Sequence, residues 1–263
     1  AKMAALGDCV DRLVRLWGKA HHYLCYMFIL ISFTGSLIKE MQVLPDGFFN
    51  DRRNFLNVYF VKFAWGWTLF PLLPFIAISN YCCTRDVSFA LRRLGALAVG
   101  TAVWYTCTRA FLYIEDLTGA CYEPRPGGAL RSAHASRPAC RGAGHHWAGF
   151  DISGHSFLLA YSALLIGEEM VPMGHVRSVR ASVPQLCGVL LSVLYLGLNV
   201  LVGVWVLMFA CTSVYFHDAA QKLLGTAVGL LAWYLTYKLW YRQPFSPRLP
   251  PQPRERRAKV GAE

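Results

Sequence analysis

The stretch LCGVLLSVLYLGLNVLVGVWVLMFA, residues 186–210, contains no charged side chain. About 20 consecutive apolar residues are enough for a helix to cross a bilayer, so this segment alone predicts a membrane-spanning helix. Five further segments approach this length on either side of it. The six segments are His22–Ile38, Leu56–Ser79, Leu91–Ile114, His155–Met170, Leu186–Ala210 and Ala219–Trp240. We predict an all-α polytopic membrane protein whose residues 1–243 form six transmembrane helices.

The composition supports this class. Hydrophobic residues make up 55% of the 263-residue chain and charged residues only 16%, against ~25% in soluble domains. The net charge of +11 does not indicate nucleic-acid binding, because the basic residues lie between apolar segments and in the tail rather than in one stripe. Residues 244–263 are rich in proline and arginine, and we expect them to form a disordered cytosolic tail.

The basic residues beside the apolar segments predict the orientation. More of them lie on the side of the N-terminus and the tail, so the positive-inside rule favours both termini in the cytosol. The polar segment of about 115–154 is then a lumenal loop. Cys121 and Cys140 lie in it, and a disulfide or two free thiols both remain open, depending on whether the loop faces an oxidising compartment.

Counting membrane crossings places His155 and His217 at one membrane face. His155 opens the fourth segment and His217 follows the fifth, so two crossings return the chain to the same side. The same count places Lys62 and Arg109 near this face, inside apolar segments where ionisable groups are costly. They are candidates for binding a phosphate; the alternatives are that Lys62 extends to the interface and that Arg109 pairs with a nearby carboxylate.

The stretch GFDISGHSFLL, residues 149–159, predicts a phosphate site. A helix that begins at Ser153 offers unpaired N–H groups and a positive dipole end. Ser153 suits the N-cap position, and Gly154 lets the backbone approach a ligand. With two histidines at one face, one imidazole can attack phosphorus while the other protonates the leaving oxygen, and no metal or other cofactor is needed.

Three alternatives remain open at this point. The Ser-Gly-His cluster is also what a structural cap with an incidental interfacial histidine looks like. Two facing histidines can ligate a haem. A zinc site of Cys121, Cys140, His145 and His146 is a further alternative, although its spacing matches no standard pattern.

Several long runs of the chain strongly resemble the fat storage-inducing transmembrane family. The runs are GFDISGHSFLL, NVYFVKFAWGW (57–67), LPFIAISNY (73–81), VLMFACTSVYFH (206–217) and LLAWYLTYKLWY (230–241). The resemblance covers all six segments. It implies a lipid-phosphatase-like protein of the endoplasmic reticulum that hydrolyses fatty acyl-CoA to acyl 4'-phosphopantetheine and adenosine 3',5'-bisphosphate. It also implies a role in lipid droplet formation and binding of diacylglycerol and triacylglycerol.

The resemblance assigns roles to the two histidines. His217 is implied as the nucleophile and His155 as the acid and base, although the two roles remain interchangeable. Three departures stand out from the wider lipid phosphatase pattern, because Ala210-Cys211 replaces an expected Ser-Arg pair, Gln221 replaces an expected aspartate, and a lysine-to-Arg-Pro motif is not visible. The positive charge for the phosphate must then come from elsewhere, and the candidates are Lys62, Arg109 and the helix start at Ser153 and Gly154. Asp151 and Asp218 are candidates for orienting a histidine.

A non-enzymatic function is the alternative. In that case the apolar helices collect diacylglycerol and triacylglycerol from the membrane lipids, and both histidines are only interfacial structure. In the enzyme, by contrast, we expect the acyl chain to lie along residues 157–159 in the bilayer.

Overall fold

The computed structural model describes residues 2–252 except 43, 46, 52, 126, 127 and 132–135. Its α-helices are α1 (Lys2–Ala20), α2 (Leu24–Glu40), α3 (Ala64–Thr84), α4 (Val87–Thr118), α5 (Arg137–Gly142), α6 (Gly154–Glu169), α7 (Pro172–Ser178), α8 (Gln185–Tyr215) and α9 (Ala219–Trp233). Short 3-10 and π-helical segments are η1 (His21–Tyr23), η2 (Leu56–Val61), η3 (Arg180–Ser182), η4 (Tyr234–Leu239) and η5 (Trp240–Arg242). The strands are β1 (Ala120–Arg125), β2 (Gly128–Arg131) and β3 (His146–Ala148).

The predicted all-α membrane architecture is confirmed. Within the described residues, five helical segments are long and apolar enough to cross a membrane. They are His21–Glu40, Ala64–Thr84, Val87–Thr118, Gly154–Ser178 and Gln185–Tyr215. The sixth predicted segment, Ala219–Trp240, is not one continuous α-helix, because only its first 15 residues form α9. The chain then continues through the π-helical η4 and the 3-10 turn η5 to Arg242.

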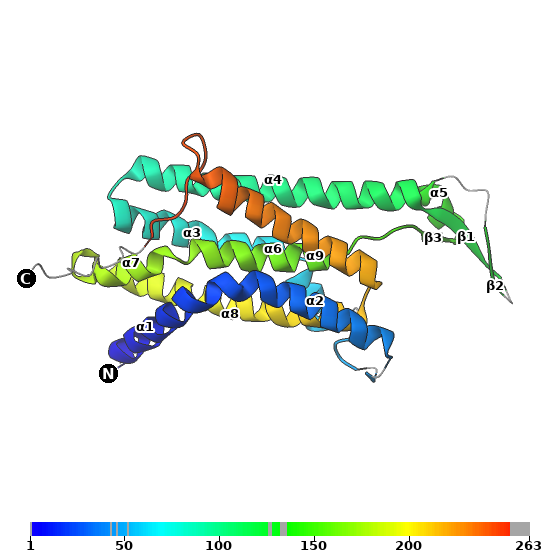
Figure 1. The fold of residues 1–263 in the computed structure, drawn as a ribbon, viewed down its shortest axis with the longest axis horizontal. Coiled ribbons are helices and arrows are strands. Elements are labelled where there is room, and N and C mark those ends of the chain that lie inside the picture. The colour runs from blue at the N-terminus through cyan, green and yellow to red at the C-terminus, as the bar shows by residue number, and fades with distance from the viewer. Residues whose placement is uncertain are drawn as a thin grey trace, which may run out of the picture.

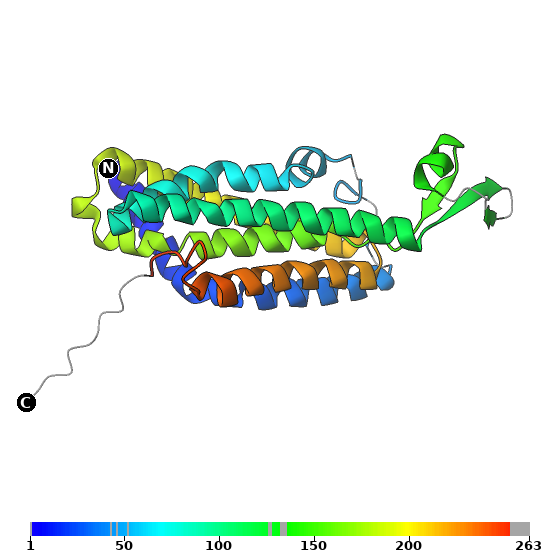
Figure 2. The same cartoon turned by 90° about the horizontal axis from the view of Figure 1, so that it is seen from above.

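Helix α6 lies at the centre of the bundle, with α9 packed along one side and α8 along another (Figures 1 and 2). The most apolar stretch of the Gly154–Ser178 segment is 89% buried, against 28–39% for the other four segments. Phe157, Leu158 and Leu159 are all buried in the protein core. Our expectation that an acyl chain lies along these three side chains in the bilayer is therefore wrong, because they contact protein on all sides rather than lipid.

Small residues bring α9 close to the start of α6. A Cβ atom on Gly225 would lie 2.4 Å from the Ser153 carbonyl oxygen, and one on Gly229 would lie 2.8 Å from that of Phe157. These glycines are four residues apart, which places them on one face of α9 and allows the two backbones to touch. The N-terminus of α9 is thereby held against the N-terminus of α6.

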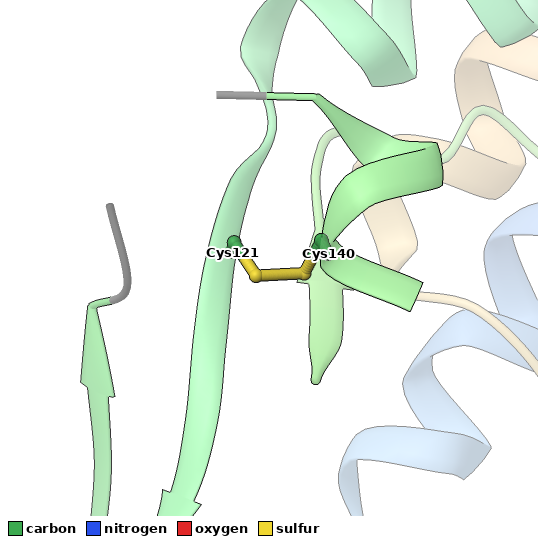
Figure 3. The surroundings of a disulfide bond; sticks show 2 residues. All are labelled: Cys121 and Cys140. Carbon is green, nitrogen blue, oxygen red and sulfur yellow. A yellow bond between two sulfur atoms is a disulfide. The ribbon is translucent and has the colours of Figure 1, made fainter. Parts of the chain in front are cut away.

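The predicted lumenal loop contains a small sheet of its own. Strand β1 pairs antiparallel with both β2 and β3, giving the order β2-β1-β3, and the sheet projects beyond one end of the bundle (Figures 1 and 2). Cys121 on β1 and Cys140 on α5 form a disulfide, with their Cα atoms 5.7 Å apart (Figure 3). Because each sulfur is bonded to the other, neither is a thiolate ligand for the zinc site that the sequence left open.

A buried ion pair lies toward the opposite end of the bundle. Arg93 on α4 pairs with Glu169 on α6, and both side chains are fully buried. Tyr237 donates a hydrogen bond to Glu169 at 2.5 Å, and Arg93 also donates to the carbonyl of Arg248. The structure describes residues 244–252 of the predicted disordered tail, and the carbonyls of Pro244, Ser246 and Arg248 accept hydrogen bonds from Arg92 and Arg93 on α4; the disordered tail stays a prediction. Residues 253–263 lie outside the described residues.

Candidate active site

A cavity of about 130 Å³ lies at the end of the bundle where α6 and α9 begin. Its lining residues are Asn57, Asp151, His155, Phe216 and His217. Three separate parts of the chain meet here, namely η2, the start of α6 and the connection between α8 and α9. The prediction that His155 and His217 lie at one face is confirmed, since both line the same cavity.

The α6 side of the cavity is fixed by its helix cap. Ser153 Oγ accepts the N–H of Ser156 at 3.2 Å and the Ser156 hydroxyl at 2.9 Å, which is the bonding expected of an N-cap residue. Ser153 is fully buried, so its side chain holds the helix start rather than reaching outward. Gly154 is exposed and has open space beside its Cα. His155 follows, half-buried, in the first turn.

The α9 side of the cavity is fixed by a tight turn at His217. Its φ angle is +53°, in the left-handed region that non-glycine residues adopt only when the surroundings hold them there. Lys39 on α2 donates a hydrogen bond to the carbonyl of His217, which supports this conformation. Asp218 then caps α9 and forms a reciprocal capping box with Gln221.

Two oxygens face the Nδ1 atom of His217. Gln221 Oε1 lies 3.3 Å away, and Asp151 Oδ2 lies 3.6 Å away. Of the two aspartates predicted to orient a histidine, the structure brings Asp151 to His217, whereas Asp218 caps α9 and lies 3.6 Å from the Lys39 ammonium. Gln221 occupies the position at which the wider lipid phosphatase pattern expects an aspartate. The sequence identified it only as a departure from that pattern.

The positively charged residues beside His217 are not those that we predicted. Lys62 ends η2 with an exposed side chain, Arg109 is exposed on α4, and neither lines the cavity. Lys39 does not line the cavity either, but its ammonium donates to the His217 backbone carbonyl, and its side chain is 29% exposed. Lys222 is fully buried one turn into α9 and donates to the carbonyl of Ser213 at 2.6 Å. Lys39 follows an apolar segment directly, and this sequence position gave no signal that it folds back onto His217.

The size of the cavity limits what it can enclose. Its volume is about 130 Å³. It is therefore smaller than the ~300–1,000 Å³ typical of sites that enclose a whole organic ligand. A phosphoryl group fits this space, whereas a haem macrocycle, the second alternative from the sequence, does not. The arrangement suits two imidazoles acting on one small charged group at the mouth of the cavity.

Comparison with known proteins identifies the family. The profile of the fat storage-inducing transmembrane protein family matches residues 45–195. Acyl-coenzyme A diphosphatase FITM2 of Danio rerio is 52% identical over 96% of this chain and 98% of its own length. The Homo sapiens protein of the same name is 48% identical over 88% of this chain and 87% of its own length.

A second type of relative is more distant. Fat storage-inducing transmembrane protein 1 of Homo sapiens is 40% identical over 92% of this chain and 78% of its own length. No solved structure shows a significant match. The family profile covers more than half of the chain, and the relatives match it over nearly its full length at high identity. The chain therefore belongs to the fat storage-inducing transmembrane protein family.

Proposed function

We propose that this protein is a fatty acyl-CoA diphosphatase, which hydrolyses acyl-CoA to acyl 4'-phosphopantetheine and adenosine 3',5'-bisphosphate. The observation that carries the proposal is the cavity in which His155 and His217 meet. Relatives that are 47–52% identical bear the name acyl-coenzyme A diphosphatase. In this function the protein supports lipid droplet formation and the homeostasis of its membrane.

The first step transfers a phosphoryl group to the protein. His217 attacks one phosphorus of the diphosphate through Nε2, and the bond from that phosphorus to the bridging oxygen breaks. His155, as an imidazolium, gives its proton to the leaving oxygen. The products are a phosphohistidine at position 217 that still carries one organic half of the substrate as its ester, a neutral His155, and the other half released as a monophosphate.

The second step regenerates the enzyme. Neutral His155 takes a proton from a water molecule as that water attacks the phosphohistidine, and the bond between phosphorus and Nε2 breaks. The second monophosphate leaves, and His155 is again protonated. The sequence of events uses one water per acyl-CoA and leaves both histidines in their starting states.

Lys39 is the cation that we propose for the phosphate. Its ammonium carries three N–H donors, and it lies against both the carbonyl of His217 and the carboxylate of Asp218. A diphosphate bound at His217 is then within reach of a positive charge that replaces the missing arginine of the wider lipid phosphatase pattern. Lys62 and Arg109 remain predictions for this role.

We also propose that the protein lies in the endoplasmic reticulum membrane with both termini in the cytosol and the cavity in the lumen. The distribution of basic residues supports this orientation. The Cys121–Cys140 disulfide lies at the same end of the bundle as the cavity, and disulfides persist on the oxidising side of a membrane. Protease protection of epitope tags at the two termini in sealed microsomes tests the orientation.

Purified protein in lipid nanodiscs tests the enzymatic proposal. His155→Ala and His217→Ala should each abolish acyl-CoA hydrolysis while the protein remains folded. His175→Ala is the matched control, because His175 lies on α7, outside the cavity, and we expect its turnover to match the unaltered protein. Normal turnover in His217→Ala would refute the proposal.

Binding of diacylglycerol and triacylglycerol is a second function that the structure supports. A groove of about 810 Å³ runs between the start of α2 and the segment from α9 to η5, far from the histidine cavity. Tyr23, Tyr26, Trp233 and Tyr234 contribute to its lining, and aromatic rings of this kind lie at the boundary between lipid and water. If the groove binds neutral lipid, the His155/His217 double variant keeps this binding while losing hydrolysis.

A further inference from the structure

The two nitrogens of the His217 ring have different surroundings. Nδ1 faces Gln221 Oε1 at 3.3 Å and Asp151 Oδ2 at 3.6 Å. The first distance is within hydrogen-bond reach and the second is beyond it. Gln221 is therefore the direct partner of the ring, and Asp151 adds a negative charge close by.

The capping box decides which end of the Gln221 amide faces the ring. The backbone N–H of Asp218 points at the Gln221 side chain at 3.2 Å. An N–H group needs an acceptor there, so the amide oxygen, not the NH₂ group, occupies this place. The same oxygen is the atom beside His217 Nδ1. Since this oxygen can only accept, Nδ1 must carry the hydrogen.

A hydrogen on Nδ1 leaves the lone pair of the neutral ring on Nε2. A nucleophilic histidine needs this tautomer, because the attacking nitrogen must be unprotonated while the other nitrogen is held in place. We propose that Gln221 is a positioning residue for His217, which fixes both its tautomer and its ring orientation, with Asp151 supplying the charge that an amide lacks. This inference rests on the proposed function.

Gln221 also joins the two halves of the site. Its backbone carbonyl accepts the N–H of Ser153 at 3.1 Å, directly before the helix start that carries His155. One residue therefore touches His217 through its side chain and the Ser153 segment through its backbone. Any displacement of Gln221 changes the position of both histidines together.

A pH–rate profile separates positioning from a purely structural role. The charged and titratable groups around His217 are Asp151, His155, Lys39, Asp218 and Lys222. Gln221→Glu keeps the capping box, since glutamate fills this position equally well, and adds a carboxylate against Nδ1. A carboxylate stabilises the imidazolium, so the ascending limb of kcat/KM against pH should move up by about one pH unit.

Gln221→Leu removes the acceptor. We expect kcat to fall roughly 10- to 100-fold with KM changed less than about twofold, because the ring loses its orientation rather than its substrate. Thr226→Val is the matched control for loosening of α9. This substitution removes the hydrogen bonds that Thr226 donates to Ser32 Oγ on α2 and to the Lys222 carbonyl on α9. The ascending limb of kcat/KM against pH should stay in place.

The outcomes distinguish this inference from the proposed function. If His217→Ala is inactive but Gln221→Glu has the unaltered pH profile, the positioning role is refuted and the enzyme stands. If His217→Ala remains active, the proposed function fails and the inference fails with it. Should Gln221→Leu not fold, the Gln221→Glu profile still decides, because that variant keeps every hydrogen bond of the helix cap.

Discussion

The Arg93–Glu169 and His217–Asp151 contacts, at opposite ends of the bundle, differ in burial and in contact distance. At the end away from the cavity, Arg93 and Glu169 are fully buried and paired, and Arg93 also binds the carbonyl of Arg248 in the C-terminal segment. At the cavity end, the His217 side chain is 19% and the Asp151 side chain 55% exposed, and their contact is longer than a hydrogen bond. Charges that are buried and paired, such as Arg93 and Glu169, hold helices together. Charges that share an open cavity with loose contacts remain available for chemistry.

The largest effect is expected from breaking the buried pair. Glu169→Ala leaves the Arg93 guanidinium without its carboxylate in the protein interior. Such a loss typically costs about 3–5 kcal/mol. We expect this fall in the free energy of unfolding, measured by denaturant titration in mixed micelles. An Arg93→Met/Glu169→Leu double variant should recover most of it, and a single variant losing under ~1 kcal/mol would contradict the comparison.

The next largest effect is expected at Gly225, where α9 contacts the start of α6 beside the cavity. Gly225→Ala places a Cβ against the Ser153 carbonyl, a backbone atom that cannot rotate away. We expect a loss of about 1–3 kcal/mol and a clear loss of turnover, as α9 moves off α6. Gly197→Ala adds the same atom to α8 where nothing lies within 4 Å. Equal thermal stability and activity in the two variants would show that this close approach is unimportant.

An effect of similar size tests which cation binds the phosphate at the cavity. Lys39→Met removes a charge-assisted contact to the bound phosphate, and such contacts are worth about 1.5–3 kcal/mol. We therefore expect kcat/KM to fall about tenfold or more. Lys62→Met and Arg109→Met make the same change at exposed positions outside the cavity. If either of these costs more than Lys39→Met, the assignment of Lys39 is wrong.

The smallest effect concerns α1, at the end opposite the cavity. Arg177 binds Asp11 through two hydrogen bonds, of 2.7 and 2.8 Å, and this lowers the pKa of Asp11 below its ordinary value of 3.8. A lowered pKa stabilises the folded state above pH ~4, and this contribution disappears as the pH falls through the folded-state pKa. The pair is partly exposed, so we expect under ~1 kcal/mol.

Hydrogen exchange of α1 measures this contribution. The protection factors of the α1 amides, which correct for the intrinsic pH dependence of exchange, should fall below pH ~4 in the unaltered protein, as Asp11 becomes protonated. Asp11→Asn, which keeps the shape of the side chain without the charge, should exchange faster at neutral pH and lose this dependence. The same pH dependence in both proteins would remove Asp11 as its source.

Much of the fold follows from the sequence because hydropathy needs no knowledge of neighbours. The apolar segments, the shared face of His155 and His217, and the family all came from local patterns. The burial of individual side chains could not be predicted from local patterns, since it depends on which helices pack together. The sequence places Lys62 and Arg109 inside apolar segments, yet both are exposed, whereas Arg93, Glu169 and Lys222 are fully buried.

The candidate site was predicted only in part, because it too depends on which segments of the chain pack together. Counting crossings paired the histidines, but the sequence did not indicate that Asn57 and Phe216 line the cavity or that Lys39 folds onto His217. Gln221 was noticed only as a missing aspartate. An amide oxygen can replace a carboxylate as a hydrogen-bond acceptor, and only the three-dimensional contact reveals that it does so here.

The central position of α6 has a consequence for how the protein is made. The ribosome produces the Ser153–His155 segment well before α9, yet α9 supplies the close contacts at Gly225 and Gly229 that cover the start of α6. Until α9 enters the membrane, that face of α6 is open to lipid or to whatever protein escorts the growing chain. The contacts that hold the start of α6 against α9 therefore form only after α9 has been inserted.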